Sequence, residues 1–407
     1  MSYILTKMTD IIEFNPREFI AKKQVCKKVP MEYLQPFTRQ ISGYEEASYA
    51  GGTKFRNNDT IMARITPCLE NGKTAFVKGF AENEVVFGST EYIVMRAIPG
   101  HSDPAFIYYL ATSPSFREVA IKSMVGSSGR QRVQQDVLEN LELILPDYET
   151  QVRVGKVLSA FDDKIELNAQ INHNLEEQAK AIFKSWFVDF EPFRDGQFVD
   201  SELGKIPQGW KVGSISDLGN IVGGSTPSKS KPEYYTSSGI PWITPKDLSI
   251  NKSKFISHGE IDITPIGLKN SSTTIMPQGT VLFSSRAPIG YIAIAKNEIS
   301  TNQGFKSIVP FEHIGTSFVY CFLKENLFRI ESMASGSTFK EVSGSIMKGI
   351  PAIVPDSESL KQFSNICNSM FMEQKHRENE IHALEKVRDT LLPKLMSGEI
   401  DVSEVEI

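Results

Sequence analysis

The sequence predicts an α+β protein in which two mixed α/β heads alternate with two long helices, as a tandem repeat with pseudo-twofold symmetry. The first observation behind this prediction is a duplicated helical ladder. Positions spaced three and four residues apart run from Val154 to Trp186, and adding 209 to each gives a second ladder from Phe363 to Leu395. Because no insertion interrupts this offset, the two ladders indicate a duplication.

The second observation is that the stretch before each ladder repeats in the same order. The offset drifts from about 220 to 209 through these stretches, which indicates that their loops differ in length. A shared scaffold with divergent loops is typical of heads that bind different targets. The matched segments are Asp59-Thr-Ile-Met-Ala with Gly279-Thr-Val-Leu-Phe, Tyr92-Ile-Val-Met with Phe305-Lys-Ser-Ile, Phe106 and Phe116 with Phe318 and Phe328, and Leu145-Pro146 with Val354-Pro355.

The first head is predicted to contain short strands followed by two helices. Alternating or continuously apolar runs separated by Asn-Gly, Gly and Pro favour strands, and aromatic and aliphatic residues at helical spacing follow them. The second head repeats this order. The predicted strands of the first head span residues 60–65, 74–77, 85–87 and 92–95, and its predicted helices span residues 104–112 and 113–124.

Each long helix follows a Pro-Asp step, Pro146-Asp147 or Pro355-Asp356. Aspartate is a good N-cap because its carboxylate accepts a hydrogen bond from a free backbone N–H, and Glu149 and Glu358 suit the positive end of the helix dipole. Helices of roughly 35 to 40 residues would be about 50 to 60 Å long at a rise of 1.5 Å per residue.

A helix of that length with a narrow apolar stripe needs a partner, and the other ladder is the nearest candidate. We therefore expect the two helices to pair as an antiparallel coiled coil, whereas in the alternative each helix only caps its own head. Polar residues within the ladders, Asn168, Asn172, Gln374 and Arg377, would fix the register. The predicted coiled-coil core consists of Leu158, Phe161, Ile165, Leu175, Ile182, Cys367, Met370, Ile381, Leu384 and Leu391.

These signals divide the chain into six predicted segments. Each head is followed by a helical repeat, and a linker returns the chain to the second head. The segments are the first head (1–146), the central helical repeat (147–187), a linker (188–208), the second head (209–355), the C-terminal helical repeat (356–397) and a tail (398–407).

Composition places the chain among ordinary globular proteins. Of its 407 residues 40% are apolar and 10% aromatic, which excludes disordered and fibrous classes. Its four cysteines have no CxxC or Cys/His spacing, and no secretory signal follows Met1, so we expect reduced thiols in a cytoplasmic protein. No apolar run has the roughly 18 to 20 residues needed to span a bilayer.

The net charge of −5 is unevenly distributed. The first head carries 17 basic against 16 acidic residues, and residues 209–355 carry 14 against 10. Residues 147–208 carry 7 against 12, and residues 356–407 carry 6 against 11. The acidic excess therefore lies in the helical repeats, and a basic binding face on each head is compatible with the overall charge.

Motifs for catalysis are absent from the sequence. Asn71-Gly-Lys-Thr resembles the end of a Walker A loop, but Pro67 replaces the required glycine. Asn15-Pro-Arg-Glu lacks the second proline and the aromatic residue of an adenine methyltransferase motif. Pro146-Asp147 and Pro355-Asp356 fit helix caps better than a nuclease site, and the six histidines have no HExxH spacing. We expect no catalytic residue, no metal site and no cofactor in this chain.

The head loops instead combine cationic, hydroxyl and amide side chains. Lys, Ser and Thr suit phosphate oxygens, whereas Arg, Asn and Gln can pair with base edges in the major groove. Solvated turns are the alternative for any single loop, but recurrence in both heads favours double-stranded DNA. The predicted DNA-binding residues are Lys54, Arg56, Arg64, Thr66, Asn71, Lys73, Arg130, Gln131, Arg132, Ser225, Thr226, Ser228, Lys229, Thr244, Lys246, Ser285, Arg286, Asn302, Gln303, Lys306, Ser337 and Lys340.

The whole pattern resembles the specificity subunits of type I restriction-modification systems, in which two target-recognition domains alternate with two helical repeats. The junction into the second head carries the resemblance most clearly. The first head departs from it, because it lacks the Gly-Trp start and the Gly-Gly-Ser-Thr-Pro loop of the second. The similar segments are Ala181-Ile-Phe-Lys-Ser-Trp-Phe-Val-Asp-Phe-Glu-Pro-Phe193, Leu203-Gly-Lys-Ile-Pro-Gln-Gly-Trp210, Gly223-Gly-Ser-Thr-Pro-Ser228, Ser285-Arg-Ala-Pro-Ile-Gly290, Thr301-Asn-Gln-Gly304 and Leu391-Leu-Pro-Lys-Leu-Met-Ser-Gly-Glu-Ile400.

The resemblance implies a non-catalytic subunit in which each head reads one half of a bipartite DNA site and the helices set the spacer. It further implies two methyltransferase subunits, which use S-adenosylmethionine, and motor-nuclease subunits, which use ATP and Mg²⁺. A recognition subunit of another bipartite system, such as a type IIB-like one, is the nearest alternative. A coiled-coil adaptor that binds protein and a stand-alone nuclease are alternatives from other classes.

Overall fold

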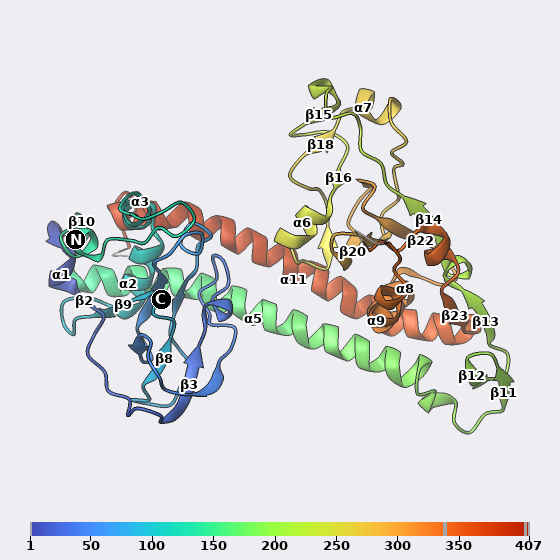
Figure 1. Ribbon diagram of the computed structural model, residues 1–407, viewed down its shortest axis with the longest axis horizontal. Coiled ribbons are helices and arrows are strands. Elements are labelled where there is room, and N and C mark those ends of the chain that lie inside the picture. Colours follow the sequence, from blue (N-terminus) through green and yellow to red (C-terminus); the bar gives the residue numbers. More distant parts are fainter. Residues whose placement is uncertain (1, 337–339, 403–404, 406–407) are drawn as a thin grey trace. The chain divides into compact units, whose positions relative to one another are not determined.

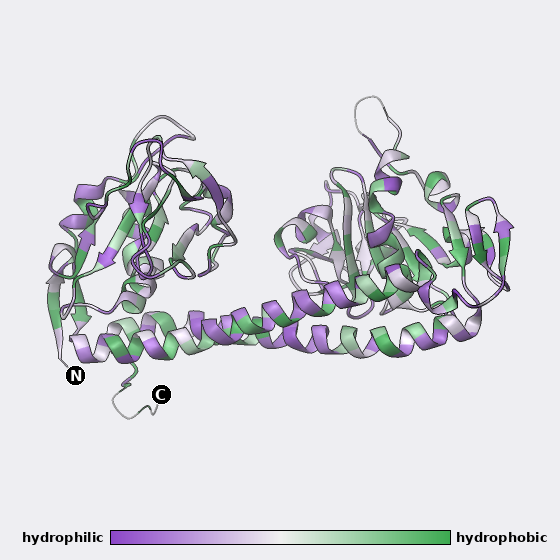
Figure 2. Ribbon diagram, turned by 90° about the horizontal axis from the view of Figure 1, so that it is seen from below, coloured by the Kyte–Doolittle hydropathy of each residue, from purple (hydrophilic) through white to green (hydrophobic). Residues whose placement is uncertain are grey.

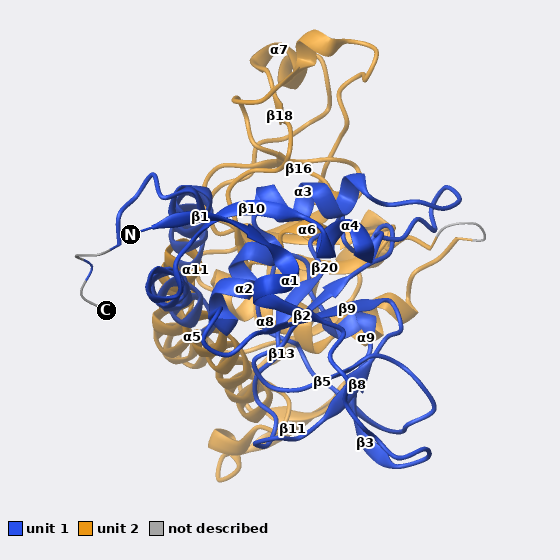
Figure 3. Cartoon of the chain, turned by 90° about the vertical axis from the view of Figure 1, so that its left-hand side faces the viewer, with its two compact units in different colours: residues 1–166, 381–407 blue, residues 167–380 orange. Residues whose placement is uncertain are grey.

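The chain divides into two compact units, which are coloured separately in Figure 3. The computed structural model describes residues 2–336, 340–402 and 405. Unit 1 comprises residues 1–166 and 381–407, and unit 2 comprises residues 167–380. Each unit thus contains one head and part of each long helix, so the units divide both helices that the predicted segments keep whole.

The long helices are α5 (Tyr148–Phe187) and α11 (Ser357–Ser397), labelled in Figure 1. Their predicted aspartate caps are confirmed. Asp147 Oδ1 accepts the backbone N–H of Thr150 at 3.0 Å, and Asp356 Oδ1 accepts that of Ser359 at 2.9 Å. Hydrogen bonds from the backbone N–H groups of Ser2 and Thr150 hold the pKa of Asp147 well below its usual range.

The second carboxylate oxygen of each cap holds the start of the adjoining head. Asp147 Oδ2 accepts the backbone N–H of Ser2 at 3.0 Å, and Asp356 Oδ2 accepts Trp210 Nε1 at 2.7 Å. An aspartate cap therefore fastens each head to its long helix. The first head donates a backbone amide to its cap, and the second head donates an indole N–H.

Both heads are built on the same antiparallel sheet. The strand order is β2-β9-β6-β7 in unit 1 and β14-β22-β19-β20-β17 in unit 2, where only β17 pairs in parallel. Helix α2 (Pro104–Thr112) packs on the first sheet and α8 (Thr316–Glu325) on the second. The strands are β2 (Ile12–Phe14), β9 (Tyr92–Ala97), β6 (Thr60–Ala63), β7 (Thr74–Phe76), β14 (Gly219–Gly223), β22 (Lys306–Pro310), β19 (Val281–Ser285), β20 (Ile289–Ala295) and β17 (Phe255–Ile256).

Shorter elements complete each head, and several of them have no counterpart in the sequence prediction. In both heads the first strand pairs antiparallel with the last, as β1 with β10 in the first head and as β13 with β23 in the second. Unit 1 adds a second sheet of order β4-β3-β8-β5. The strands are β1 (Tyr3–Lys7), β3 (Val25–Val29), β4 (Glu45–Ser48), β5 (Lys54–Phe55), β8 (Val86–Gly88), β10 (Glu142–Pro146), β11 (Phe198–Ser201), β12 (Gly204–Pro207), β13 (Lys211–Ser214), β15 (Tyr235–Thr236), β16 (Trp242–Ile243), β18 (Asp262–Ile263), β21 (Ser300–Thr301) and β23 (Pro351–Val354).

Short helices connect these strands and lie on the surface of the heads. The two helices predicted for the first head are confirmed as α2 and α3. The short helices are α1 (Met8–Ile11), α3 (Pro114–Lys122), α4 (Gln135–Glu139), α6 (Pro245–Ile250), α7 (Pro265–Lys269), α9 (Leu327–Ser332) and α10 (Gly344–Lys348).

The cores of the heads confirm three of the four matched phenylalanines and correct the fourth. Phe106 and Phe116 are fully buried and Phe318 is 1% exposed, but Phe328 is 86% exposed. Ile330, two residues further on, is fully buried instead. The predicted match failed because the offset between the two copies drifts through the heads, so Ile330 and not Phe328 is the buried residue of α9.

Close approach between each head and its long helix depends on one small residue. A Cβ at Gly155 of α5 would lie 2.6 Å from Asp103 Oδ1, the side chain that caps α2. In unit 2 the small residue is on the other partner, because a Cβ at Gly315 before α8 would lie 3.1 Å from Ser364 Oγ of α11.

Within each unit the two helix segments run antiparallel and share polar contacts. In unit 2, Arg377 Nη1 donates to Asn168 Oδ1 at 2.9 Å, and Gln374 Nε2 donates to the backbone oxygen of Asn172 at 3.0 Å. The four polar residues predicted to fix the register thus contact one another. Figure 2 shows hydrophilic and hydrophobic residues alternating along both helices. Of the ten predicted core residues, Leu158 and Cys367 are buried and the others are half-buried.

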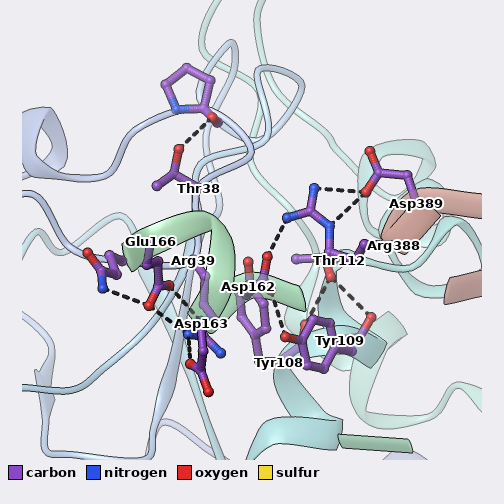
Figure 4. Close-up of polar contacts among 12 residues, drawn as sticks. Thr38, Arg39, Tyr108, Tyr109, Thr112, Asp162, Asp163, Glu166, Arg388 and Asp389 are labelled. Atoms are coloured by element: carbon purple, nitrogen blue, oxygen red, sulfur yellow. Dashed lines mark hydrogen bonds and ion pairs between the residues drawn. The ribbon is translucent and has the colours of Figure 1, made fainter. Parts of the chain in front are cut away.

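A buried polar cluster joins the head of unit 1 to its helix segments (Figure 4). Arg39 is 4% exposed, donates from Nη2 to Asp163 of α5, and donates from Nε to Glu166 Oε1 at 2.7 Å. Beside it, Tyr109 of α2 donates its hydroxyl to Asp162 at 2.6 Å, and the same carboxylate forms an ion pair with Arg388 of α11. A head loop, a head helix and both long helices therefore meet at these charges.

Unit 2 holds an equivalent cluster around a buried lysine. Lys254 is 8% exposed and its Nζ lies 2.5 Å from Glu176 Oε2 of α5 and 2.6 Å from Gln374 Oε1 of α11. The Tyr320 hydroxyl donates to Glu176 Oε1 at 2.8 Å. Glu378 accepts the backbone N–H of Lys254 at 2.7 Å. Burial lowers the pKa of Lys254. Burial acts to raise the pKa of Glu176, but the charge of Lys254 and the hydrogen bonds from Lys254 and Tyr320 together lower it.

We expect Asp162→Ala to lower the free energy of unfolding by about 3 to 5 kcal/mol, because it leaves the buried Arg388 and the Tyr109 hydroxyl without this partner. Denaturant titration of the full chain measures the change.

The control is Glu118→Ala, which removes an exposed ion pair with Lys122 on α3 and should cost less than about 0.5 kcal/mol. Equal effects of the two substitutions would show that the buried cluster contributes no more than a surface pair.

Candidate nucleic-acid interface

A cavity of about 780 Å³ opens in the head of unit 2 and gathers a large part of the predicted DNA-binding residues. It lies where the loops after β14, β16 and β21 meet. Seven predicted residues line it together with the aromatic side chains Tyr235 and Trp242. The seven are Thr226, Lys229, Thr244, Lys246, Arg286, Asn302 and Gln303.

Backbone pairing explains why these three loops meet. Strand β16 pairs in parallel with β21, so both strands end at the same edge. The backbone N–H of Ser225 donates to the Thr301 oxygen at 3.0 Å, which joins the loop after β14 to that edge. A Cβ at Gly224 would lie 2.0 Å from the Asn302 oxygen, so only glycine allows this close approach.

Side chains at the cavity hold one another in place. The Thr226 hydroxyl donates to Gln303 Oε1, and Asn302 Oδ1 accepts the backbone N–H of Gly304 at 2.8 Å. These contacts orient the two amide groups that the sequence predicts as base-reading residues. The amide N–H groups of Gln303 and Asn302 are donors of the kind that hydrogen-bond base edges.

Thr244 has a local structural role in addition to its predicted one. Its hydroxyl and backbone N–H bond with Asp247 in a capping box at the start of α6. Asp247 also accepts the backbone N–H of Glu260 at 2.8 Å, so its carboxylate is hydrogen-bonded within the head. Lys246 Nζ contacts Glu260 Oε2 at 2.6 Å at the rim of the cavity. Lys229 and Arg286 add further positive charge there.

Sequence reasoning missed the aromatic wall of the cavity. Trp242 is 6% exposed and donates Nε1 to the Ser225 oxygen at 3.0 Å, while Tyr235 packs against it edge to face. Both lie in two-residue strands, which are too short to show a periodic pattern. The Ile-Pro-Trp-Ile sequence at 240–243 was the available signal, because a large aromatic residue between aliphatic residues indicates burial.

The other predicted residues of the second head lie outside the cavity lining. Ser285 is fully buried in β19 and its Oγ donates to the Gly304 oxygen at 3.2 Å, so it is reassigned from a DNA contact to a support of the loop. Lys306 lies 3.3 Å from Glu341, and Lys340 and Ser228 are exposed. Ser225 is half-buried, and Ser337 lies outside the described residues.

Several predicted residues of the first head are engaged within it. Lys54 Nζ donates to the Glu18 oxygen at 2.6 Å, and Arg56 Nε lies 3.5 Å from a Glu18 carboxylate oxygen. Lys73 Nζ donates to the Met31 oxygen at 2.9 Å. Arg64 donates to the Val133 oxygen at 3.2 Å. These cations stabilise loops of the head, and their role in binding DNA stays a prediction.

Other predicted residues of the first head face solvent. Asn71 and Arg130 are exposed. Gln131 and Thr66 are half-buried, and the Thr66 hydroxyl donates to Glu70 Oε1 at 3.2 Å. Arg132 forms an ion pair with Glu91 at 2.6 Å. The polar loop at residues 126–132 is thus an accessible surface with two arginines.

Within the described part of the chain, no three His, Cys, Asp or Glu side chains are placed to hold a metal ion. None of the described helices combines the length and apolar character needed to cross a membrane.

The chain belongs to the family of type I restriction modification DNA specificity domains, whose model matches residues 5–177 and 207–382. The two matched segments correspond to the two copies of the repeat, each a head with most of the helix that follows it.

Known relatives agree with this family. The type I restriction enzyme HindI specificity subunit of Haemophilus influenzae is 28% identical over 89% of this chain and 90% of its own length. The MjaIX specificity subunit of Methanocaldococcus jannaschii is 40% identical over 47% of this chain, but the match spans only 44% of that relative. A crystal structure of a type I restriction-modification S subunit from M. genitalium shares the fold, with a TM-score of 0.57, 16% identity and coverage of 97% and 96% of the two chains.

We expect Trp242→Ala to lower the free energy of unfolding by about 3 to 5 kcal/mol, since it removes a buried indole and leaves the Ser225 oxygen without its donor. The matched control is Phe328→Ala, which removes an aromatic ring that is 86% exposed and should change stability by less than about 0.5 kcal/mol. Denaturant unfolding compares them, and a small loss for Trp242→Ala would mean that the cavity wall is not a packed part of the head.

Proposed function

We propose that this chain is the DNA sequence-specificity subunit of a type I restriction-modification complex. The observation that carries the proposal is the convergence of Thr226, Lys229, Arg286, Asn302 and Gln303 on one cavity, although they come from separate loops. Membership of the specificity-domain family supports the same function.

The cavity residues divide by the part of DNA that they suit. Lys229 and Lys246 at the rim carry charges that suit phosphate oxygens, and contacts to phosphate position a protein without reading sequence. Arg286, Asn302 and Gln303 carry planar groups that can bond base edges in pairs. Because Thr226 holds Gln303, this amide is oriented before DNA binds.

Each head reads one half of a bipartite site in this proposal. Both heads have the same central four strands, but unit 2 adds the short pairs β15-β18 and β16-β21 with α6 and α7, whereas unit 1 adds the sheet of β3, β4, β5 and β8. Loops built on different additions present different side chains. The two half-sites therefore differ in sequence.

The helices set the spacer between the half-sites as one continuous antiparallel coiled coil. The contacts of Asn168 with Arg377 in unit 2, and of Asp162 with Arg388 in unit 1, support this pairing. A helix of 40 residues is about 60 Å long at 1.5 Å per residue. One turn of B-DNA is about 34 Å, so this length suits half-sites separated by one or more turns.

Catalysis in the complex is assigned to other subunits. Two methyltransferase subunits would dock on the helical repeats, whose acidic side chains Asp163 and Glu177 are largely exposed. These subunits would use S-adenosylmethionine, and motor-nuclease subunits would use ATP and Mg²⁺. This chain contributes recognition and the spacing of the partners.

We expect Gln303→Ala and Arg130→Ala to relax base preference in different half-sites. Losing one paired base contact costs about 1 to 3 kcal/mol, a loss of roughly 5- to 150-fold in discrimination at the affected position. Selection from a pool of randomised duplexes, using the chain assembled with its methyltransferase subunits, measures preference at every position. Each variant serves as the control for the other, and a loss spread equally over both half-sites by either variant would contradict one head per half-site.

We expect insertion of one heptad into both helices, after Leu167 and after Glu380, to lengthen the preferred spacer by about 3 base pairs. Seven residues add about 10 Å at 1.5 Å per residue, and base pairs are about 3.4 Å apart. Both anchoring clusters, at Arg39 and at Lys254, stay on their own side of the insertions.

The spacer is measured with the same randomised duplexes. The length-neutral control is Gln170→Ala with His376→Ala, two exposed positions that should leave the spacer as it is. A lengthened coiled coil that still selects the original spacer would refute the role of the helices as a ruler.

A further inference from the structure

The two heads carry a matching three-stranded junction beside the loops that face solvent. In unit 1, Val125 and Arg132 exchange both backbone hydrogen bonds, at 3.0 and 2.9 Å. In unit 2, Ser335 and Glu341 do the same, at 3.1 and 2.9 Å. The next residue, Val133 or Val342, is fully buried in each head.

Further backbone bonds establish which positions correspond. Val133 N–H donates to the Arg64 oxygen and Val342 N–H to the Ser285 oxygen, each at 2.9 Å. Arg64 N–H then donates to the Glu91 oxygen at 2.9 Å, and Ser285 N–H to the Gly304 oxygen at 2.7 Å.

We call three positions of this junction the bridged triplet. Ile65 and Arg132 are bridged in unit 1, as are Arg286 and Glu341 in unit 2. The triplet is Ile65, Glu91 and Arg132 in unit 1, and Arg286, Gly304 and Glu341 in unit 2.

Each triplet contains one arginine and one glutamate, but at exchanged positions. The arginine is at the third position in unit 1 and at the first in unit 2. The glutamate is at the second position in unit 1 and at the third in unit 2. Both heads thus place a guanidinium beside a carboxylate at this junction, with the two side chains at different positions of the triplet.

The pair in unit 1 leaves one edge of the guanidinium free for a ligand. Arg132 Nε lies 3.0 Å from both Glu91 carboxylate oxygens, and Nη2 lies 2.6 Å from Oε1. These bonds occupy the edge of the guanidinium formed by Nε and Nη2. Nη1 donates to the Arg130 backbone oxygen at 3.4 Å, which engages one of its two N–H groups. The other Nη1 N–H and the second Nη2 N–H form the end edge, and their spacing suits O6 and N7 of guanine in the major groove. Arg132 is 45% exposed, so the edge is accessible.

The pair in unit 2 is looser and lies at the cavity. Arg286 Nη1 is 3.8 Å from Glu341 Oε2, and Lys306 Nζ shares the carboxylate at 3.3 Å. Arg286 lines the cavity together with Asn302 and Gln303. Here the carboxylate stands between two cations, and Gly304 has no side chain where unit 1 has Glu91, because Asn302 Oδ1 would lie 2.9 Å from a Cβ at this position.

We propose that the bridged triplet is where each head reads a guanine, through Arg132 in unit 1 and Arg286 in unit 2, with Glu91 and Glu341 as positioning residues. This inference rests on the proposed function, since it assigns base-reading residues to a DNA-binding head. It goes beyond that function in naming the base, the two arginines and the carboxylates that orient them.

The test uses four variants in unit 1 with the chain assembled with its methyltransferase subunits and a pool of randomised duplexes as the probe. Arg132→Ala should lower the preference for guanine at one position of one half-site by about 10-fold or more. Arg132→Lys should restore overall affinity but not this preference, because an ammonium lacks the planar fork. Glu91→Gln should keep guanine preferred at that position but weaken the preference several-fold.

The control is Glu118→Gln, which weakens another exposed ion pair of unit 1 and should change no base preference. Thermal unfolding of each variant is followed in parallel. A purely structural role for Arg132 or Glu91 would weaken the preference at all positions of one half-site together and lower the unfolding temperature, and that result overturns the inference.

Failure of the inference is distinguishable from failure of the proposed function. If the wild-type complex enriches no split motif from the pool, the proposed function fails. If it enriches a split motif and Arg132→Ala leaves the preference at every position unchanged, the triplet inference fails while the proposed function stands. Arg286→Ala gives the corresponding result for the other half-site.

Discussion

A buried cation at the base of each head is the interaction on which the rest of the structure depends. Arg39 and Lys254 are 4% and 8% exposed, and a buried charge is tolerated only when it is paired and hydrogen-bonded. The partners are carboxylates and an amide on the long helices. Each head can therefore dock on its helix segments in only one register without leaving a buried charge unpaired. Because this cation fixes the docked part of each head, the loops that contact DNA can differ in sequence between the heads.

Duplication preserved the base of the heads and changed their upper parts. The strand order of the central sheet, the tyrosine of the packing helix and the aspartate cap recur in both units. The residues that meet them differ in detail. Ser2 takes the place of Trp210 at the cap, and the glycine of each helix contact moves from α5 to the loop before α8. The same contact is thus made in both units by different residues, as it is in the bridged triplets.

The elements that could be predicted from the sequence are those with a local signal. The long helices follow from their spacing, and α2 and the strands at Thr60 and Tyr92 follow from apolar runs between turn residues. Phe328 was matched wrongly because the offset drifts through the heads, and only the structure shows that Ile330 enters the core. The very short strands β15 to β18 gave no periodic signal.

The binding surface was predictable by residue type but not by position. Seven loop residues of the second head converge as expected for a binding site, because Gly, Thr, Asn and Gln mark exposed loops. Ser285 and Arg64 are polar residues of the kinds predicted to bind DNA, yet their side chains donate to backbone oxygens within the head and support its loops. Arg39 and Lys254 were missed because their partners lie more than a hundred residues away. Pairing at that separation leaves no pattern in one sequence.

The central claim is that two heads on one helical frame read a split DNA site. Sequencing the methylated bases in host DNA, with and without this chain, tests it most directly. The account predicts two short specified half-sites of different sequence, separated by an unspecified spacer of fixed length, and the loss of this methylation when the chain is deleted. A single uninterrupted motif, or methylation that persists without the chain, would contradict it.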